Sequence, residues 1–134
     1  MAGVVILDAS ALIGLHDPAD PHHDWALEVF RTTLDKKLAM AVLTYAEVLV
    51  HPTKAGNKDL FESNIKGLEI EILPLTEASA GTLAGLRART RLKMPDVIVL
   101  HSAIETSGTI ATSDKALASA ANDLGLQVLA PFAL

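Results

Sequence analysis

The stretch Val4-Val5-Ile6-Leu7, followed directly by Asp8, decides the fold class. Four consecutive apolar residues are typical of a strand that is buried on both faces of a parallel sheet. Further runs of strand type follow, each separated from the next by helical sequence, and they span 38–43, 69–73, 109–112 and 127–129. This alternation predicts an α/β fold, a three-layer sandwich with a central, mainly parallel five-stranded sheet.

The predicted helices lie between these strands, and turn residues set most of their ends. They span 10–15, 21–38, 44–51, 57–68, 76–92, 96–106 and 115–124. Asp20 is the expected N-cap of the second helix, with Pro21 at its first position, and Pro52 is expected to end the third. No repeat or linker interrupts the pattern, so residues 1–134 are expected to form a single domain, within the usual range of ~100–200 residues.

The composition excludes several kinds of site. The chain has no cysteine, which excludes disulfides, thiolate zinc sites and thiol nucleophiles. The net charge of −5 and the 4% of aromatic residues argue against bulk electrostatic binding of nucleic acid and against an aromatic platform for bases. No apolar run approaches the ~18 residues of a membrane span. We therefore expect a cytoplasmic domain that does not enter a membrane.

Four acidic residues are expected at the carboxyl edge of the predicted sheet. Asp8 follows the first strand, Glu47 lies in the first helical turn after the second, and Asp114 follows the fourth. Asp96 opens an apolar helix directly after Pro95 and is expected to point to the same edge. Ligands of parallel sheets bind at this edge, near the point where the strand order reverses. The acids therefore mark the expected site.

Each of these acids also has a purely structural explanation. Thr44-Tyr-Ala-Glu47 fits a capping box, Asp114 could cap its own helix, and Ser10 could cap the helix after Asp8. The structural explanation is weaker for the four acids together than for each one alone. Four carboxylates at one edge repel one another and raise one another's pKa values. A hard divalent cation such as Mg²⁺ or Mn²⁺ relieves that repulsion. The pattern therefore predicts a metal site.

The chemistry expected of such a site is metal-dependent phosphodiester hydrolysis. Mg²⁺ held by carboxylates can activate water and stabilise charge on phosphoryl oxygens, and no nucleophile is required from the protein. Two alternatives remain open. One is phosphoaspartyl chemistry of the receiver or haloacid dehalogenase kind, although the latter usually needs Asp-x-Asp where this chain has Asp8-Ala-Ser10. The other is a non-catalytic protein-binding module whose acids are helix caps.

Four segments of the chain resemble the signature segments of PIN-domain ribonucleases, in the same order. They are VVILDAS (4–10), TYAEVLV (44–50), MPDVIVLHSA (94–103) and IATSDKAL (110–117). Length and layout resemble the VapC toxins of bacterial VapBC toxin–antitoxin pairs. The resemblance implies an Mg²⁺- or Mn²⁺-dependent endoribonuclease that cleaves RNA, is a homodimer, and is inhibited by a small antitoxin whose tail fills the active groove.

The resemblance also implies roles for individual residues of this chain. It places Asp8, Glu47, Asp96 and Asp114 around the metal. It assigns Thr112 and Ser10 to the orientation of ligands or water. The histidine-rich segment at 22–23 lies outside the signature segments and inherits no role from them.

A basic cluster directly precedes Asp96 and is the expected contact for RNA. It consists of Arg87, Arg89, Arg91 and Lys93. If the helix continued through the cluster, Arg87 and Arg91 would share one face, and Arg89 and Lys93 would lie roughly opposite. We therefore expect at most one pair to follow a phosphate backbone; the alternative is a solvated helix end favoured by the helix dipole.

The histidines are expected to be structural. His22 and His23 lie in an Asp-Pro-x-Asp-Pro context that is typical of turns, so we expect turn hydrogen bonding there rather than a second metal site. His101 lies in an apolar helix and is expected to pack in the core.

Overall fold

A computed structural model describes residues 3–134. The strands are β1 (Val4–Leu7), β2 (Lys37–Ala41), β3 (Glu71–Leu73), β4 (Thr109–Ala111) and β5 (Val128–Leu129). The helices are α1 (Ala9–His16), α2 (His23–Thr32), α3 (Val42–Ala55), α4 (Lys58–Gly67), α5 (Ala80–Thr90), α6 (Met94–Thr106) and α7 (Lys115–Asp123), with a short 3₁₀ turn, η1 (Glu77–Ser79).

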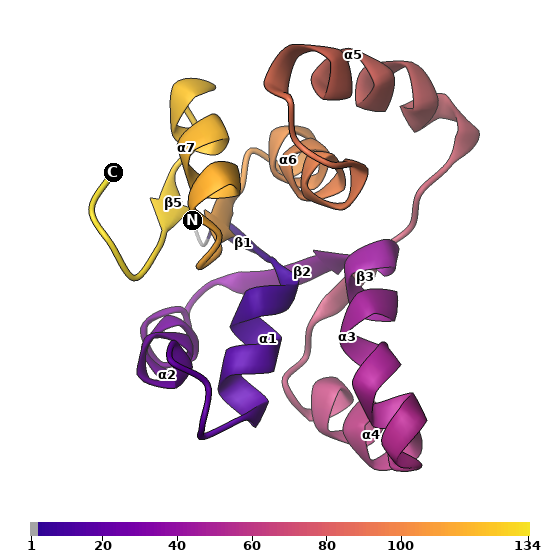
Figure 1. Cartoon of the computed structure of the whole chain (residues 1–134), viewed down its shortest axis with the longest axis vertical. Coiled ribbons are helices and arrows are strands. Elements are labelled where there is room, and N and C mark those ends of the chain that lie inside the picture. Colours follow the sequence, from indigo (N-terminus) through magenta and orange to yellow (C-terminus); the bar gives the residue numbers. More distant parts are fainter. Residues whose placement is uncertain (1–2) are drawn as a thin grey trace.

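The five strands form one sheet in the order β3-β2-β1-β4-β5, and every neighbouring pair is parallel (Figure 1). Strand β1 lies in the middle, paired with β2 on one side and with β4 on the other. The strand order reverses between β1 and β4, so their carboxyl ends border the position where parallel sheets bind ligands. The predicted parallel five-stranded sheet is confirmed.

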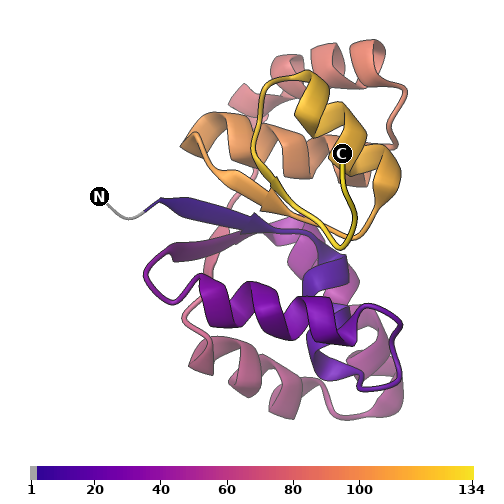
Figure 2. The same cartoon turned by 90° about the vertical axis from the view of Figure 1, so that its left-hand side faces the viewer.

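Helices cover both faces of the sheet, with α1 to α4 on one face and α5 to α7 on the other (Figure 2). The buried side chains of β1 serve both layers. Ile6 belongs to the core cluster that contains Leu100 of α6, whereas Val5 and Leu7 pack in a second cluster with Val29 of α2. An apolar residue at every position of β1 is the consequence of this double burial. The three-layer sandwich is therefore confirmed.

Helix α2 is shorter than predicted at both ends. Its N-cap is His22, so Asp20 does not cap it; the Asp20 carboxylate instead accepts a hydrogen bond from the His22 backbone N–H at 2.8 Å. The helix ends at Thr32 rather than near residue 38, and Leu34, which lies beyond its end, is 85% exposed. The hydroxyl of Thr33 donates to the Val29 carbonyl at 2.7 Å and helps to close the last turn.

Helix α3 begins earlier and ends later than predicted. It begins at Val42, so Glu47 lies in its second turn, and its N-cap is Ala41. The capping box from Thr44 to Glu47 is therefore wrong. Pro52 does not end the helix: it is buried, its carbonyl accepts from the Asn57 N–H at 3.0 Å, and the helix stops at Gly56, whose φ of +79° suits glycine.

The long helix predicted over 76–92 is interrupted. It consists of the turn η1 followed by α5, which ends at Thr90. Arg91 has a φ of +62°, in the left-handed region, and turns the chain toward α6. Arg91 and Lys93 are consequently not on a helix with Arg87 and Arg89, and the predicted division into two helical faces is wrong.

The histidines lie as expected. The Asp17 and Asp20 carboxylates accept turn hydrogen bonds from the Ala19 and His22 N–H groups. The Nδ1 of His23 is 2.7 Å from the Gly14 carbonyl, a contact that joins α2 to α1. His101 is 5% exposed and packs in the core. Among the helices within residues 3–134, none has both the length and the apolar character that crossing a bilayer requires.

Candidate active site

Strands β1 and β4 bring two predicted site residues together at the carboxyl edge of the sheet. Asp8 directly follows β1, and Thr112 directly follows β4. The parallel register pairs Leu7 with Ala111, and the Asp8 backbone N–H donates to the Ala111 carbonyl at 3.0 Å. Residues that are 104 positions apart in sequence thereby become neighbours.

Asp8 is the most deeply buried of the four acids, with a relative exposure of 9%. Thr112 Oγ1 donates to its Oδ2 at 2.8 Å, and Ser10 Oγ donates to the same oxygen at 3.1 Å. Burial raises the pKa of Asp8, while these two hydrogen bonds and one from the Ala9 backbone lower it. Asp8 occupies the N-cap position of α1 without a side-chain capping bond, so Ser10 does not cap this helix.

The two hydroxyl groups also fix the loop that carries Asp114. Thr112 Oγ1 accepts a hydrogen bond from the Asp114 backbone N–H at 3.0 Å, and Ser10 Oγ accepts one from the Ser113 N–H at 3.0 Å. Asp114 is the N-cap of α7, which is the structural alternative considered for it, and its Oδ1 accepts from the Leu117 N–H at 2.9 Å. Each hydroxyl therefore links the Asp8 carboxylate to the backbone next to Asp114. The sequence gives no sign of the Ser113 contact.

Helix α6 supplies Asp96 in its first turn, and helix α3 supplies Glu47. Partial burial, together with the charges of Asp114, Asp8 and Glu47, raises the pKa of Asp96 to about 6. Partial desolvation and the charge of Asp8 likewise raise the pKa of Glu47. All four acids thus lie close enough for their charges to interact, although they come from four separate elements.

Nothing in the described protein neutralises this group. Within residues 3–134, no Lys, Arg or His side chain forms an ion pair with Asp8, Glu47, Asp96 or Asp114. Lys93, the N-cap residue of α6, lowers the pKa of Asp96, but its effect is smaller than those of burial and of the other three acids. In the same residues, no three of the side chains converge closely enough to coordinate one ion in their present orientations. The site is therefore an uncompensated acidic group rather than a preformed cage.

The raised pKa of Asp96 gives a first prediction, for the metal-free protein. A carboxyl whose pKa is higher in the folded protein than its ordinary 3.8 stabilises the fold below about pH 4, and this contribution is lost as the pH rises through about 6. We expect Asp96→Asn to be more stable than the parent at pH 7 by about 1 kcal/mol, since solvent screens a half-exposed carboxylate. The difference should vanish near pH 4.

Thermal unfolding in a chelator across pH 4–7.5 measures this effect. Asp123→Asn is the matched control, because Asp123 is an exposed carboxylate at the far end of α7. Parallel pH profiles for the parent and Asp96→Asn would contradict the prediction.

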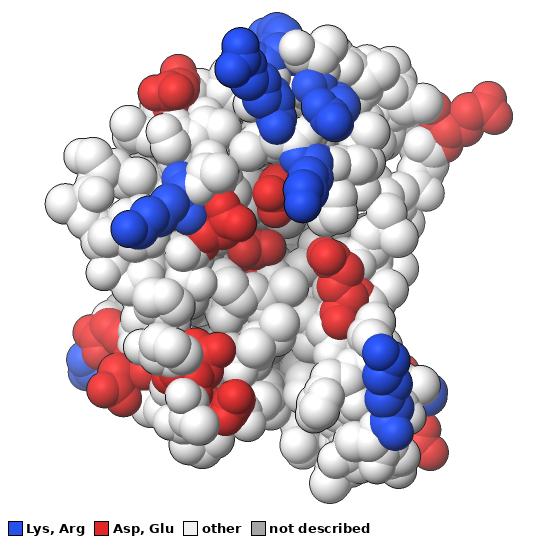
Figure 3. Space-filling view, viewed as in Figure 1, with Lys and Arg blue, Asp and Glu red and all other residues white. Residues whose placement is uncertain are grey.

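The structure places only part of the basic cluster at residues 87–93 close to the four acids. Lys93 is close enough to Asp96 to act on its pKa. Arg89 instead borders a hollow that it shares with Asp123 and Leu124, at the end of α7 away from Asp114. Figure 3 shows acidic side chains in the middle of this face, with basic side chains over α5 and over the start of α7.

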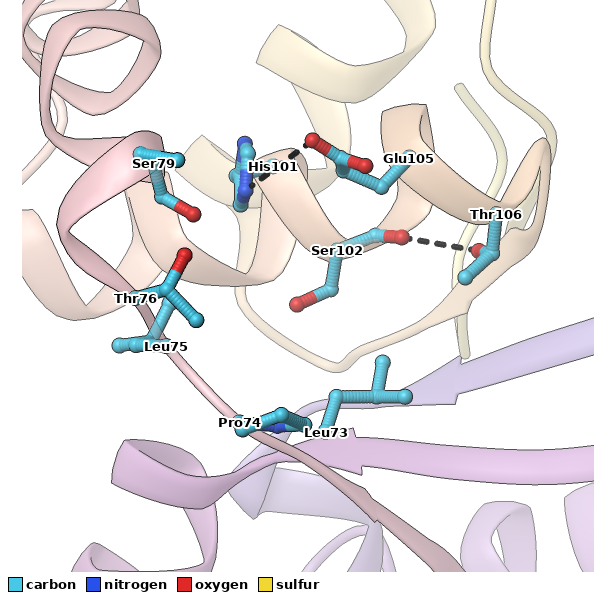
Figure 4. A pocket seen from close by; sticks show the side chains of 10 residues that line it. Leu73, Pro74, Leu75, Thr76, Ser79, His101, Ser102, Glu105 and Thr106 are labelled. Carbon is cyan, nitrogen blue, oxygen red and sulfur yellow. Dashed lines mark hydrogen bonds and ion pairs between the residues drawn. The ribbon is translucent and has the colours of Figure 1, made fainter.

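A separate hollow of about 440 Å³ lies between α6 and the segment that leaves β3 (Figure 4). His101 and Glu105 line it, with Nε2 of His101 3.6 Å from Oε1 of Glu105. Nδ1 of His101 is buried and has no hydrogen-bond partner among residues 3–134. These residues lie in the second half of α6, whereas Asp96 is in its first turn, so the hollow is not part of the acidic site.

Comparisons with known proteins agree with this geometry. A family model described as the PIN domain matches residues 5–123. A toxin–antitoxin complex from Klebsiella pneumoniae has a TM-score of 0.77 and 19% identity over 97% of this chain and 99% of that chain. FitAcB from Neisseria gonorrhoeae has a TM-score of 0.75 and 19% identity over 97% of this chain and 99% of that chain. VapBC2 from Rickettsia felis, bound to a DNA fragment from its promoter, has a TM-score of 0.69 and 15% identity over 95% of this chain and 98% of that chain. No curated protein matches by sequence.

Proposed function

The chain belongs to the PIN domain family, and we propose that it is a divalent-metal-dependent endoribonuclease, the toxin of a toxin–antitoxin pair. One observation carries the proposal: Asp8, Glu47, Asp96 and Asp114 share one edge of the sheet without a cation partner in residues 3–134. Family membership supports nuclease chemistry, and the similar solved structures support the toxin assignment. The proposal takes residues 1–134 as one nuclease domain acting on RNA in the cytoplasm.

The donor set fits a hard divalent cation. Carboxylate oxygens are the ligands that Mg²⁺ and Mn²⁺ prefer, and mutual repulsion gives these carboxylates a reason to bind one. Asp8, Glu47, Asp96 and Asp114 would hold the ion. When bound, it would activate water for attack on phosphorus and stabilise charge on the phosphate oxygens. Side-chain rotation would be needed, since Asp114 now caps α7.

The hydroxyl groups have a distinct part in this proposal. Thr112 and Ser10 both donate to Oδ2 of Asp8, so neither occupies Oδ1. Their hydrogen bonds hold the carboxylate in one rotamer and favour its charged form, against the effect of burial. We propose that they orient Asp8 so that Oδ1 faces the ion.

The test is incubation of the purified chain with total cellular RNA, with and without Mg²⁺ or Mn²⁺. We expect discrete cleavage products that appear only with the ion. Phosphorylation of Asp8 by acetyl phosphate, without RNA cleavage, would instead support phosphoaspartyl chemistry. Neither activity would favour a binding module.

An apolar surface next to Glu47 supports a homodimer as part of the proposal. Leu43, Val50 and Met94 are 41–51% exposed and line a hollow of about 360 Å³ between α3 and α6. Exposed apolar surface of this kind is typical of protein contacts. We propose that a second copy covers this surface, and that the small antitoxin binds elsewhere, across the acidic groove.

Sedimentation at micromolar concentration measures the dimer. We expect the parent chain to sediment as a dimer and Val50→Asp as a folded monomer, because a buried unpaired carboxylate costs several kcal/mol at such a contact (roughly 2–5). Leu60→Asp is the control, since Leu60 is 65% exposed on α4. A monomeric parent, or a dimer in both variants, would contradict the placement.

A further inference from the structure

Most basic side chains in the first part of the chain form ion pairs, and none in the last part does. Up to residue 86, Arg31, Lys36, Lys37 and Lys58 each contact a carboxylate, whereas Lys54 and Lys66 do not within residues 3–134. Beyond residue 86, no basic side chain of the described chain forms an ion pair. The five basic residues in this last part are Arg87, Arg89, Arg91, Lys93 and Lys115. Free positive charge is therefore concentrated in the half that contains α5 to α7.

Lys115 differs from the rest of this group in its position. It is the first residue of α7, directly after Asp114, and no Lys or Arg occurs between Lys93 and it or after it. Its position at the first turn of α7 places its backbone directly beside that of Asp114, the N-cap of the helix. Lys115 is not among the basic residues that the sequence predicts to contact RNA.

An aromatic ring holds the Lys115 side chain in place. Its Nζ lies 5.9 Å from the centroid of the Phe132 ring, within the range of a cation–π contact. Phe132 is half-buried in the segment that follows β5. The neighbouring Asp114 carboxylate accepts from the Leu117 N–H, so it does not pair with Lys115. The ammonium group thus has a ring contact but no carboxylate partner within residues 3–134, so its charge remains available on the residue next to Asp114.

We infer that Lys115 is a substrate-positioning residue that binds a backbone phosphate of single-stranded RNA next to Asp114. The inference rests on the proposed nuclease function. A polyanion that approaches four acids needs positive charge on its path, and the range of screened charges is only ~8–10 Å at physiological salt. Lys93 and Lys115 are the basic residues next to site acids in sequence, whereas Arg89 lies toward the far end of α7.

Salt-dependent binding tests the inference. The probe is a fluorescein-labelled 12-nucleotide single-stranded RNA, bound to the full chain in the Asp96→Asn background with chelator, from 50 to 500 mM KCl. For single strands each phosphate contact contributes ~0.7 to the slope of log K against log salt. We expect Lys115→Gln to lower the slope by about 0.7 and to weaken binding about fivefold at 0.1 M, and Lys115→Arg to restore both.

Control variants separate this role from a general charge effect. Lys66→Gln removes an exposed charge from α4 that is also without an ion pair, and we expect the slope to be unchanged. Phe132→Leu keeps the Lys115 charge but removes the ring face, and we expect about twofold weaker binding with the parent slope. Parent affinity in Phe132→Leu would overturn the part assigned to the ring.

Two further measurements keep the inference distinct from the proposed function. In the Asp96-containing chain, Lys115→Gln should raise KM for RNA cleavage with little change in kcat. A parent that cleaves RNA while Lys115→Gln keeps the full slope would overturn the role of Lys115 alone. A parent that never cleaves RNA would overturn the nuclease proposal. Binding of polyglutamate distinguishes RNA from an acidic protein as the partner. If Lys115→Gln weakens the binding of polyglutamate but not that of RNA, the inference that RNA is the partner of Lys115 is overturned.

Discussion

Asp96→Asn should abolish metal-dependent RNA cleavage, with a loss of about 10³-fold or more in kcat/KM, while the protein stays folded. The substitution keeps the size of the side chain and removes its charge. Asp96 interacts with each of the other three acids and has a pKa of about 6, so it is the member of the group most affected by them. Removing its charge removes a proposed ligand from the centre of the site.

The measurement is single-turnover cleavage of a labelled RNA at saturating Mg²⁺. Asp123→Asn again serves as the control, because it makes the same chemical change at the other end of α7. Circular dichroism and thermal unfolding show whether the fold survives, and Asp96→Asn should be the more stable protein without metal. Cleavage at the parent rate in Asp96→Asn would remove this residue from the active site.

Thr112→Val should cause a large loss of both stability and activity. Thr112 is fully buried, and its hydroxyl serves Asp8 as a donor and the Asp114 backbone as an acceptor. Valine has nearly the same shape but leaves the Asp114 N–H without its acceptor and Asp8 Oδ2 with only the Ser10 hydroxyl, at a cost of about 2–4 kcal/mol in the free energy of unfolding. The pKa of Asp8 should rise further, because a hydrogen bond that lowers it is lost. Cleavage should fall by about 10²-fold.

Thr112→Ser keeps the hydroxyl and separates this effect from the loss of a methyl group. Urea unfolding at pH 7 gives the stability, and cleavage at saturating Mg²⁺ gives the activity. We expect Ser to retain most of both. Equal behaviour of the Val and Ser variants would mean that the hydroxyl supports neither the fold nor the reaction.

The fold could be predicted because its decisive signals are local. The run at Val4–Leu7 is apolar at every position since both faces of β1 are covered, and short runs of this kind indicate a parallel sheet. Three of the acids follow strands closely enough to be placed at one edge from the topology alone. The capping alternative offered for Asp114 is also realised in the structure, because capping depends on neighbouring residues.

The errors concern features that distant contacts decide. Thr44 and Glu47 fit a capping box, yet α3 begins at Val42, and the Thr44 hydroxyl is buried without a hydrogen-bond partner in the described structure. Pro52 is tolerated inside α3, where it is buried. Lys115 lies in the segment 110–117, but its contact with Phe132, in the segment after β5, joins residues that are distant in sequence and could not be predicted.

The central place of β1 in the sheet also determines when the site can form. Its neighbour β4 is contributed by residues 109–111, and the donor to Asp8 from Thr112 comes just after it. A chain emerging from the ribosome at roughly 5–20 residues per second exposes Asp8 many residues before either partner exists. Until then β1 has only β2 beside it, and the Asp8 carboxylate lacks the Thr112 hydroxyl that holds it. The proposed nuclease would therefore be unable to cleave the messenger that encodes it until its ribosome has passed residue 112.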